Sequence, residues 1–503
     1  MNDSIVALVT QAARRTPEAV AITWRRSTWS YGRLLRASEH VSGALRERGV
    51  SRGDRIALLV RNSPHYAALF YGVLGAGCAA VPLNAQERAS VLVRQIQHCG
   101  ARLLFVERDH PEREALCSAL ADSKVETVAI ALDDDGNAYD RFLTELGASA
   151  PATAAAPELG DLALIIYTSG TTGRPKGVML SHGNLAANTS AIVEYLRLTA
   201  ADRVLCVLPF HFSYGNSVLN THLAVGAALV VEDNFAFPNL VLQRMQDERV
   251  TGFSGVPSTF ALLLGRCNLH DFNLSALRYL TQAGGAMPRP LIERLRSQLP
   301  AVELFVMYGQ TEATARLTYL PPEALDVKLG SVGLPLKGVE IKVFDSEGAE
   351  AAVGTTGEIC ARGPNVMLGY WADEAATAHA LRDGWLHTGD LGHKDADGFL
   401  YIDGRAVDMI KVGAFRVSPQ EIEEVIAALS DVEEVAVTAV ADELLGHAIK
   451  AVIVPREGAQ LDMRSIKAHC RERLAAYKVP KVVEFARALP RTSSGKIQRY
   501  KLA

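Results

Sequence analysis

The chain has 503 residues, 49% of them hydrophobic and 21% charged, so it can bury a large core without disulfides. Its net charge is −4 and it has no basic run, which argues against nucleic-acid binding through a basic patch. The seven cysteines are scattered and form no C-x-x-C pair, which favours a reducing, cytoplasmic setting. The first twenty residues lack the basic-then-apolar pattern of a signal peptide.

The uncharged stretch Tyr66–Leu83 is long enough to be weighed as a membrane span. It is interrupted by several glycines and by Pro82, and it is rich in alanine. We therefore predict a buried helix that begins at Ser63-Pro64, followed by a turn and a buried strand. On this interpretation the chain has no transmembrane segment.

Apolar runs of strand length alternate with helical patterns over most of the chain. This alternation predicts an α/β fold with largely parallel sheets, in which ligands bind beyond the carboxyl ends of the strands. Two polar, glycine-bearing loops follow predicted strands, at Thr168–Gly177 and Tyr308–Glu312. The predicted strands are Leu162–Tyr167, Arg203–Leu208, Ala227–Val231 and Val302–Met307, and the predicted helices are His182–Leu198 and a segment around Leu291–Leu299.

The last hundred residues have the pattern of a separate α+β unit. Ser418-Pro419-Gln420-Glu421 predicts a helix start with an N-cap, a first-turn proline and a capping-box glutamate. Strands are predicted at Glu434–Val440 and Ala448–Val454, and the boundary at Asp403-Gly404 follows the apolar strand Phe399–Ile402. The expected domains are therefore residues 1–403 and 404–503.

The segment Tyr167–Val178, YTSGTTGRPKGV, combines glycines, hydroxyl side chains and one lysine. Glycines let backbone N–H groups approach an anion, hydroxyls add donors, and a lysine supplies a point charge for phosphate. The pattern predicts a polyphosphate loop, although it is not a Walker loop; the alternative is a flexible surface linker. The candidate ligands are Thr168, Ser169, Gly170, Thr171, Thr172 and Lys176.

This loop resembles the phosphate loop of the adenylate-forming superfamily, which comprises acyl-CoA synthetases, luciferases and adenylation domains. Further motifs match in order, from Trp29-Ser30-Tyr31 to Pro490–Arg499, and the chain most resembles acyl- and aryl-CoA ligases. The resemblance implies a large domain of stacked, mostly parallel sheets with helices and a small, mobile α+β C-terminal domain. It also implies ATP, Mg²⁺ and a small carboxylic acid as ligands.

The resemblance assigns the nucleotide site residue by residue. Small residues at a strand end would lie against adenine, Tyr308 would pack on the base beside Gly309, and Thr311 would touch the α-phosphate. Glu312 would hold Mg²⁺, which suits one carboxylate with phosphate oxygens and waters. Asp390, in WLHTGDL, would accept from the ribose hydroxyls. The remaining residues implied for the site are Gly284, Gly285 and Ala286 at adenine, Arg405 at the ribose and Lys411 near the acyl-adenylate.

Lys496, in SSGKIQR, corresponds by resemblance to the catalytic lysine on the small domain. Attack of a carboxylate on the α-phosphorus brings anions together, so a cation must neutralise the developing charge. Two positions depart from the family pattern: Val407 stands where a hinge Asp or Lys is common, and Ala414 replaces a glycine. The thioester step is therefore less well supported by the sequence than adenylation.

The acyl side is assigned from LPFHFSYG. Adenylation domains for α-amino acids usually have Asp after the phenylalanine, whereas this chain has His211 after Phe210, which disfavours an α-amino acid. His211 resembles the gate near the acyl pocket of acyl- and aryl-CoA ligases, where Phe212 and Tyr214 would shape the pocket; alternatively these aromatic residues are simply core. The pattern favours an aryl or medium apolar acid.

The expected reaction is ATP-dependent formation of an acyl-adenylate, followed by transfer to the thiol of coenzyme A. The alternative acceptor is the phosphopantetheine arm of a separate acyl carrier protein. Two rivals remain at this point: a luciferase-like oxygenase and a nucleotide-binding homologue without catalysis. Lys496, Glu312, Thr311 and Asp390 together argue against the second rival.

Overall fold

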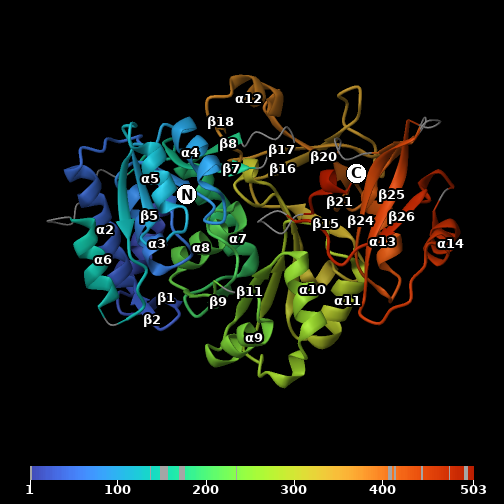
Figure 1. Ribbon diagram of the computed structural model, residues 1–503, viewed down its shortest axis with the longest axis horizontal. Helices are drawn as coiled ribbons and strands as arrows, with labels where there is room; N and C mark the ends of the chain where they lie inside the picture. Colours follow the sequence, from blue (N-terminus) through green and yellow to red (C-terminus); the bar gives the residue numbers. More distant parts are fainter. Residues whose placement is uncertain are drawn as a thin grey trace.

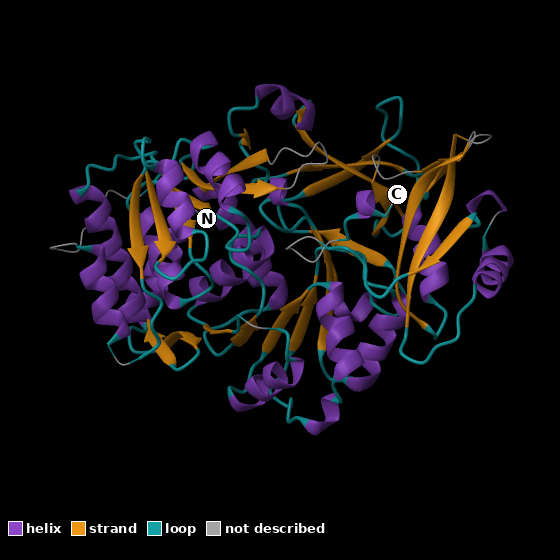
Figure 2. Cartoon of the chain, in the orientation of Figure 1, coloured by secondary structure: helices purple, strands orange, loops and turns teal. Residues whose placement is uncertain are grey.

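The computed structural model describes residues 3–135, 137–147, 157–168, 176–233, 235–405, 410–412, 415–442, 446–474, 476–491 and 497–502. Within these residues the chain forms two large sheets with helices and a smaller C-terminal unit, which lies at the right of Figure 1. The predicted α/β class is confirmed. Figure 2 shows helices on both sides of the strands throughout the N-terminal part.

The larger sheet has 14 strands, and its central part is the predicted parallel unit. Neighbouring strands there pair in parallel in the order β10, β9, β11, β12, β13, with β1 beside β10. The carboxyl ends of these strands therefore meet at one edge of the sheet. The bounds are β1 Val20–Trp24, β9 Arg203–Cys206, β10 Ala228–Val231, β11 Gly252–Gly255, β12 Tyr279–Gln282 and β13 Glu303–Tyr308.

Antiparallel strands extend the same sheet beyond β13. They follow in the order β14, β15, β21, β20, β17, β16, with β19 beside β20, and β2 closes the opposite edge. This extension brings β20, which carries Asp390, into one sheet with β12 and β13, which lead into the predicted adenine-binding loops. The bounds are β2 Ser27–Ser30, β14 Thr318–Leu320, β15 Ser331–Pro335, β16 Glu340–Phe344, β17 Gly357–Arg362, β19 Leu381–Arg382, β20 Trp385–Lys394 and β21 Leu400–Arg405.

The second sheet has seven strands in the order β18, β8, β7, β4, β3, β5, β6. Strand β7 pairs antiparallel with β8, so the predicted phosphate loop connects a hairpin. Strand β18 joins this hairpin from a segment almost two hundred residues later. The bounds are β3 Arg55–Leu59, β4 Ala79–Pro82, β5 Leu103–Glu107, β6 Glu126–Ile130, β7 Leu162–Thr168, β8 Lys176–Ser181 and β18 Gly369–Tyr370.

A shared hydrophobic core joins the two sheets through α1, α2, α3, α7 and α8. Helices α9, α10 and α11 cover the other face of the larger sheet, at the bottom of Figure 1. Helices α4 and α5 cover the outer face of the second sheet. The bounds are α1 Ile5–Arg15, α2 Tyr31–Glu47, α3 Pro64–Gly75, α4 Ala89–His98, α5 Arg113–Leu120, α6 Ala138–Leu146, α7 His182–Leu196, α8 Ser213–Val225, α9 Pro238–Asp247, α10 Pro257–Arg266, α11 Arg289–Gln298 and α12 Glu374–Ala380.

The uncharged stretch Tyr66–Leu83 folds as the sequence predicts. The Ser63 hydroxyl caps α3 by accepting from the Tyr66 N–H at 3.1 Å, and Pro64 occupies its first turn. A turn leads from this helix into the buried strand β4. Among the described residues, no helix is both long and apolar enough to cross a bilayer.

The small unit has its own core beneath a three-stranded sheet, β24, β25 and β26, and a two-stranded ribbon, β22 and β23. Its first helix is predicted correctly, but its capping box is wrong. The Ser418 hydroxyl does not cap α13; it donates to the Asp403 carbonyl at 2.5 Å and so ties the helix start to β21. The bounds are α13 Pro419–Ala427, α14 Met463–Arg473, β22 Ile410–Val412, β23 Phe415–Val417, β24 Val432–Asp442, β25 Gly446–Pro455 and β26 Val482–Phe485.

Candidate active site

Three predicted site segments follow parallel strands of the larger sheet and meet at one edge. The segment Leu208–Gly215 follows β9, Gly284–Ala286 follows β12, and Tyr308–Glu312 spans the end of β13. Strands β9, β11, β12 and β13 are consecutive neighbours, so the three loops emerge side by side. The structure therefore brings together segments that are up to one hundred residues apart in the sequence.

The predicted adenine and ribose residues make direct contact. The Tyr308 hydroxyl donates to the Asp390 carboxylate at 2.7 Å, and Asp390 is buried on β20. The Asp390 N–H donates to the Thr388 hydroxyl at 3.1 Å, which fixes the backbone before the carboxylate. Asp390 also lies opposite Arg405 in the β20–β21 register, although the Arg405 side chain lies outside the described residues.

Glycines shape the strand ends where the base is predicted to bind. A Cβ atom at Gly309 would lie 2.2 Å from the Ala315 carbonyl oxygen, so only glycine allows this loop to fold back on itself. Gly284, Gly285 and Ala286 are exposed beyond β12, and the Gln282 amide donates to the Gly285 carbonyl at 2.7 Å. The strand end therefore presents accessible backbone rather than side chains.

The residues predicted to bind the phosphates lie where the two sheets meet. Thr168 ends β7 and is paired with Lys176, the first residue of β8. The Lys176 ammonium lies 4.8 Å from the centre of the Tyr370 ring, and the Tyr370 hydroxyl donates to the Glu312 carboxylate at 2.9 Å. The intervening loop, with Ser169, Gly170, Thr171 and Thr172, lies outside the described residues.

Glu312 has the chemistry that a magnesium ligand needs. Its carboxylate is partly buried and accepts the Tyr370 hydroxyl. Within the described ranges it forms no ion pair with a lysine, arginine or histidine. Its negative charge is therefore available to a hard cation, which prefers oxygen ligands.

The residues predicted for the acyl side lie where α8 meets the loop after β13. The Ser213 and Thr311 hydroxyls lie 3.2 Å apart, at the start of α8. The rings of His211 and Phe212 are 4.1 Å apart, and the buried His211 Nε2 has no hydrogen-bond partner among the described residues. Burial lowers the pKa of His211 to about 4, so the imidazole is neutral at physiological pH.

Tyr214 is buried next to these residues. Its hydroxyl donates to the Thr281 carbonyl at 2.9 Å, and the guanidinium of Arg316 lies over its ring, 4.0 Å from the centre. The side chain that precedes His211, Phe210, is fully buried in the shared core. Of the aromatic residues in LPFHFSYG, Phe210 and Tyr214 belong to the core, whereas His211 and Phe212 lie on the loop before α8.

Sequence reasoning missed three residues that contact the predicted site: Ser213, Arg316 and Tyr370. Ser213 lies inside the LPFHFSYG motif, and Arg316 is the charged residue four positions after Glu312, so both could have been considered. No sequence motif around Tyr370 indicated a role for it, because its partners come from distant segments of the chain. The predicted catalytic Lys496, with Val407 and Ala414, lies outside the described residues, as does the Lys411 side chain.

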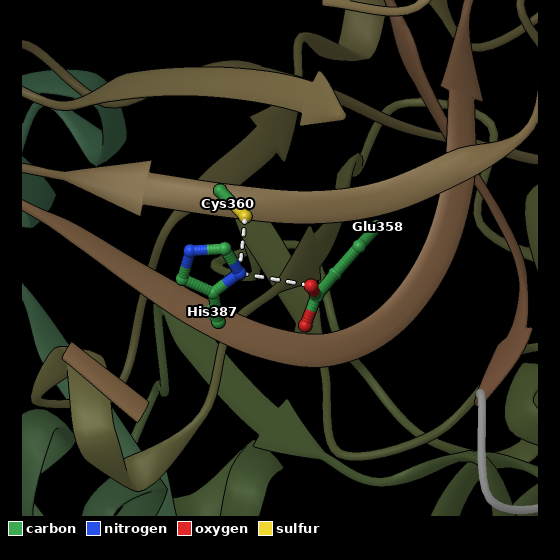
Figure 3. A group of neighbouring side chains, drawn as sticks. All are labelled: Glu358, Cys360 and His387. Carbon is green, nitrogen blue, oxygen red and sulfur yellow. Dashed lines mark hydrogen bonds and ion pairs between the residues drawn. The ribbon is translucent and has the colours of Figure 1, made fainter. Parts of the chain in front are cut away.

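A polar group supports the strand that carries Asp390 (Figure 3). The Cys360 thiol and the Glu358 carboxylate both lie against Nδ1 of His387, at 3.3 and 2.8 Å, and a second Glu358 oxygen accepts from the Gly389 N–H at 3.3 Å. In a Cys-His-Glu catalytic relay, one imidazole nitrogen contacts the thiol and the other contacts the carboxylate. Here both partners contact the same nitrogen, Nδ1, so the group is not arranged as such a relay.

The same group can be weighed as a metal site, because its ligand atoms lie within 4.8 Å of one another. Arg382, 3.6 Å from the Glu358 carboxylate, already opposes that charge. Burial and the neighbouring Glu358 raise the pKa of Cys360 to about 12, which keeps the thiol protonated. The contacts therefore fit a structural support for the part of β20 that precedes Asp390.

Comparison with known proteins places the chain in one family over nearly its whole length. Residues 9–371 match the model of the AMP-binding enzyme family, and residues 421–496 match the AMP-binding enzyme C-terminal domain. An indoleacetate–CoA ligase from Aromatoleum aromaticum is 34% identical over 96% of this chain and 94% of its own length.

Solved structures agree with this relationship. An anthranilate–CoA ligase in complex with anthranoyl-AMP superposes with a TM-score of 0.91 at 27% identity, covering 100% of this chain and 97% of its own. An o-succinylbenzoate–CoA synthetase from Bacillus subtilis, in complex with ATP and a magnesium ion, gives 0.86 at 30% identity over 98% of both chains. The chain therefore belongs to the AMP-binding enzyme family, and it is an acid–CoA ligase that uses ATP and Mg²⁺ to form an acyl-adenylate and then coenzyme A as acceptor.

Proposed function

We propose that the residues at the edge of the larger sheet divide the ligase reaction between a nucleotide half and an acyl half. Tyr308, Asp390 and Arg405 hold adenosine, while Thr311, Lys176 and the phosphate loop hold the phosphates. The main support is a set of three side-chain contacts at this edge of the sheet: Tyr308–Asp390, Thr311–Ser213 and Glu312–Tyr370. Glu312 would hold Mg²⁺, which when bound neutralises charge on the phosphate oxygens.

Lys496 is the proposed catalytic cation. The acid's carboxylate attacks the α-phosphorus of ATP, the bond to the pyrophosphate breaks, and pyrophosphate leaves with the electron pair. An ammonium beside the reacting oxygens lowers the energy of this crowded anionic state. Lys411, a second cation, is proposed to contact the acyl-adenylate that results.

A movable unit from about residue 404 onward would deliver Lys496 for this step and withdraw it for the next. Strand β21, which ends at Arg405, is the last strand of the larger sheet, and the strands after it form separate sheets. That separation supports a boundary near 403/404 and rotation of the small domain about it. In the second half-reaction the thiol of coenzyme A attacks the adenylate carbonyl and AMP leaves.

The acid is proposed to be aromatic. His211 is neutral, and it lies against Phe212, beside Tyr214 and the Ser213–Thr311 contact, so the acyl half offers flat apolar surfaces. The indoleacetate and anthranilate ligases are named for aromatic acids, which adds support. We also propose a cytoplasmic location, since all seven cysteines are free.

Substitution of Lys496 by alanine separates the two half-reactions. Without the ammonium, acid-dependent pyrophosphate release should fall about 100-fold or more, because transition-state charge loses its partner. A chemically prepared acyl-adenylate should still yield the CoA thioester at a rate close to wild type. Equal loss of both half-reactions would contradict the assigned role of Lys496.

A pyrophosphate-release screen tests the acid. Purified enzyme is assayed with aromatic, short, medium and long carboxylates, and the accepted acid is then offered with coenzyme A or with a phosphopantetheinylated carrier protein. We expect the highest kcat/KM with an aromatic acid and coenzyme A. A preference for long aliphatic acids would contradict the proposed acid class without affecting the assignment of Lys496.

A further inference from the structure

The buried guanidinium of Arg316 forms no ion pair with a carboxylate among the described residues. Among the described residues, four Asp, Glu, Lys or Arg side chains are buried, and burial of a charge is costly unless it is paired. Glu107 pairs with Arg61 at 2.7 Å, and Asp202 pairs with Arg278 at 3.0 Å. The other two buried charges are Asp390, in the nucleotide half, and Arg316.

The described residues around Arg316 do not neutralise its charge. Its Nε lies 3.2 Å from the Met307 sulfur, a weak acceptor, and one terminal nitrogen donates to the Ala315 carbonyl at a long 3.4 Å. The face of the Tyr214 ring adds a partial cation–π attraction. In the described ranges no carboxylate forms an ion pair with this guanidinium, although it is only 3% exposed.

The fold holds Arg316 in place before any substrate arrives. The Asn188 and Asn365 side-chain amides both donate to its backbone carbonyl, at 3.0 and 2.9 Å. The ring on which its guanidinium lies belongs to Tyr214, the residue after Ser213, and the Ser213 hydroxyl contacts Thr311. Arg316 is thus a fixed cation near Thr311, the residue proposed to contact the α-phosphate, and it lies on the side of Thr311 where the acid is proposed to bind.

We propose that Arg316 is a binding subsite for a second carboxylate on the acid substrate. The substrate is then an aromatic dicarboxylic acid: one carboxylate reacts near Thr311, and the other pairs with the guanidinium that lies over the Tyr214 ring. A planar guanidinium binds a carboxylate through two parallel hydrogen bonds, which adds geometric selectivity to charge. This inference rests on the proposed aromatic acid and deepens it.

Matched acids test the subsite. Pyrophosphate release is measured for benzoate against isophthalate, phenylacetate against carboxyphenylacetate, and phenylpropanoate against carboxyphenylpropanoate. We expect wild-type kcat/KM to favour the dicarboxylate of at least one pair by about 10-fold to 100-fold, the range for hydrogen bonds to charged groups. Arg316→Met should reduce that ratio to within about 3-fold, while Arg316→Lys should keep its direction because the charge remains.

A melting experiment without acid gives an independent measurement. Because Arg316→Met removes an unpaired buried charge, it should raise the Tm of the ligand-free enzyme by about 1–3 °C. The matched control is Arg278→Met, since Arg278 also lies over a tyrosine ring but pairs with buried Asp202; that variant should lower the Tm.

The outcomes separate this inference from the proposed function. A wild-type preference for the monoacid of every pair, an unchanged ratio in Arg316→Met, or unfolding of that variant would overturn the subsite and leave the ligase intact. Absence of pyrophosphate release with every aromatic acid tested, together with release on an aliphatic acid, would instead overturn the aromatic acid class. In that case a raised Tm in Arg316→Met would still identify an unneutralised charge.

Discussion

The tight loop at Gly309 gives a prediction that connects folding with nucleotide binding. In Gly309→Ala the added Cβ would lie 2.2 Å from the Ala315 carbonyl oxygen, about 1 Å closer than a normal van der Waals contact. The backbone must move, because the clashing atom belongs to the chain rather than to a flexible side chain. Overpacking of this kind costs about 1–3 kcal/mol of stability. Tyr308 and Thr311 flank the loop, so both would move with it.

A displacement of about 1 Å at a reacting group can cost about 100-fold in rate. We therefore expect Gly309→Ala to lower the urea midpoint and to lower kcat/KM for ATP by about 10-fold to 100-fold in a pyrophosphate-release assay. The control is Gly265→Ala on α10, where an added Cβ meets no atom within 4 Å and better helix propensity should add about 0.5–1 kcal/mol. Wild-type stability and ATP kinetics in Gly309→Ala would refute the reasoning.

Two further predictions concern a hydroxyl and a buried histidine. Tyr370→Phe keeps the ring near Lys176 but removes the hydroxyl that donates to Glu312. The KM for Mg·ATP should therefore rise about 10-fold. An unchanged KM in a magnesium titration would count against the role of Glu312. His65 is fully buried among aromatic rings, and burial lowers its pKa to about 4. Because the unfolded state binds the proton first, stability falls as pH drops from about 6.5 towards 4. His65→Phe should therefore flatten that decline in urea unfolding, and an equal decline in both proteins would contradict the assignment.

Local patterns predicted part of the parallel fold, namely strands β4, β7, β9, β10 and β13 and helices α3, α7 and α11. The helix at His182–Leu196 and the strand at Glu303–Tyr308 match their predicted positions within two residues, because periodicity and caps act over a few neighbours. The capping box at Ser418 was wrong for the opposite reason. Its hydroxyl donates to the carbonyl of Asp403, fifteen residues away, and the local sequence around Ser418 gives no indication of so distant an acceptor.

The sequence by itself determined the chemistry: the glycine-and-hydroxyl segment after Tyr167 and the Tyr308–Glu312 loop resemble those of adenylate-forming enzymes. His211, where adenylation domains for α-amino acids usually have aspartate, disfavours an α-amino acid as substrate. The tertiary structure alone decided which groups face one another, such as Tyr370 with Glu312 and Arg316 with Tyr214. The physical reason is that motif residues need only the right local backbone. Side-chain contacts, and the lack of a counter-charge for Arg316 among the described residues, instead depend on how sheets and helices from distant segments pack together.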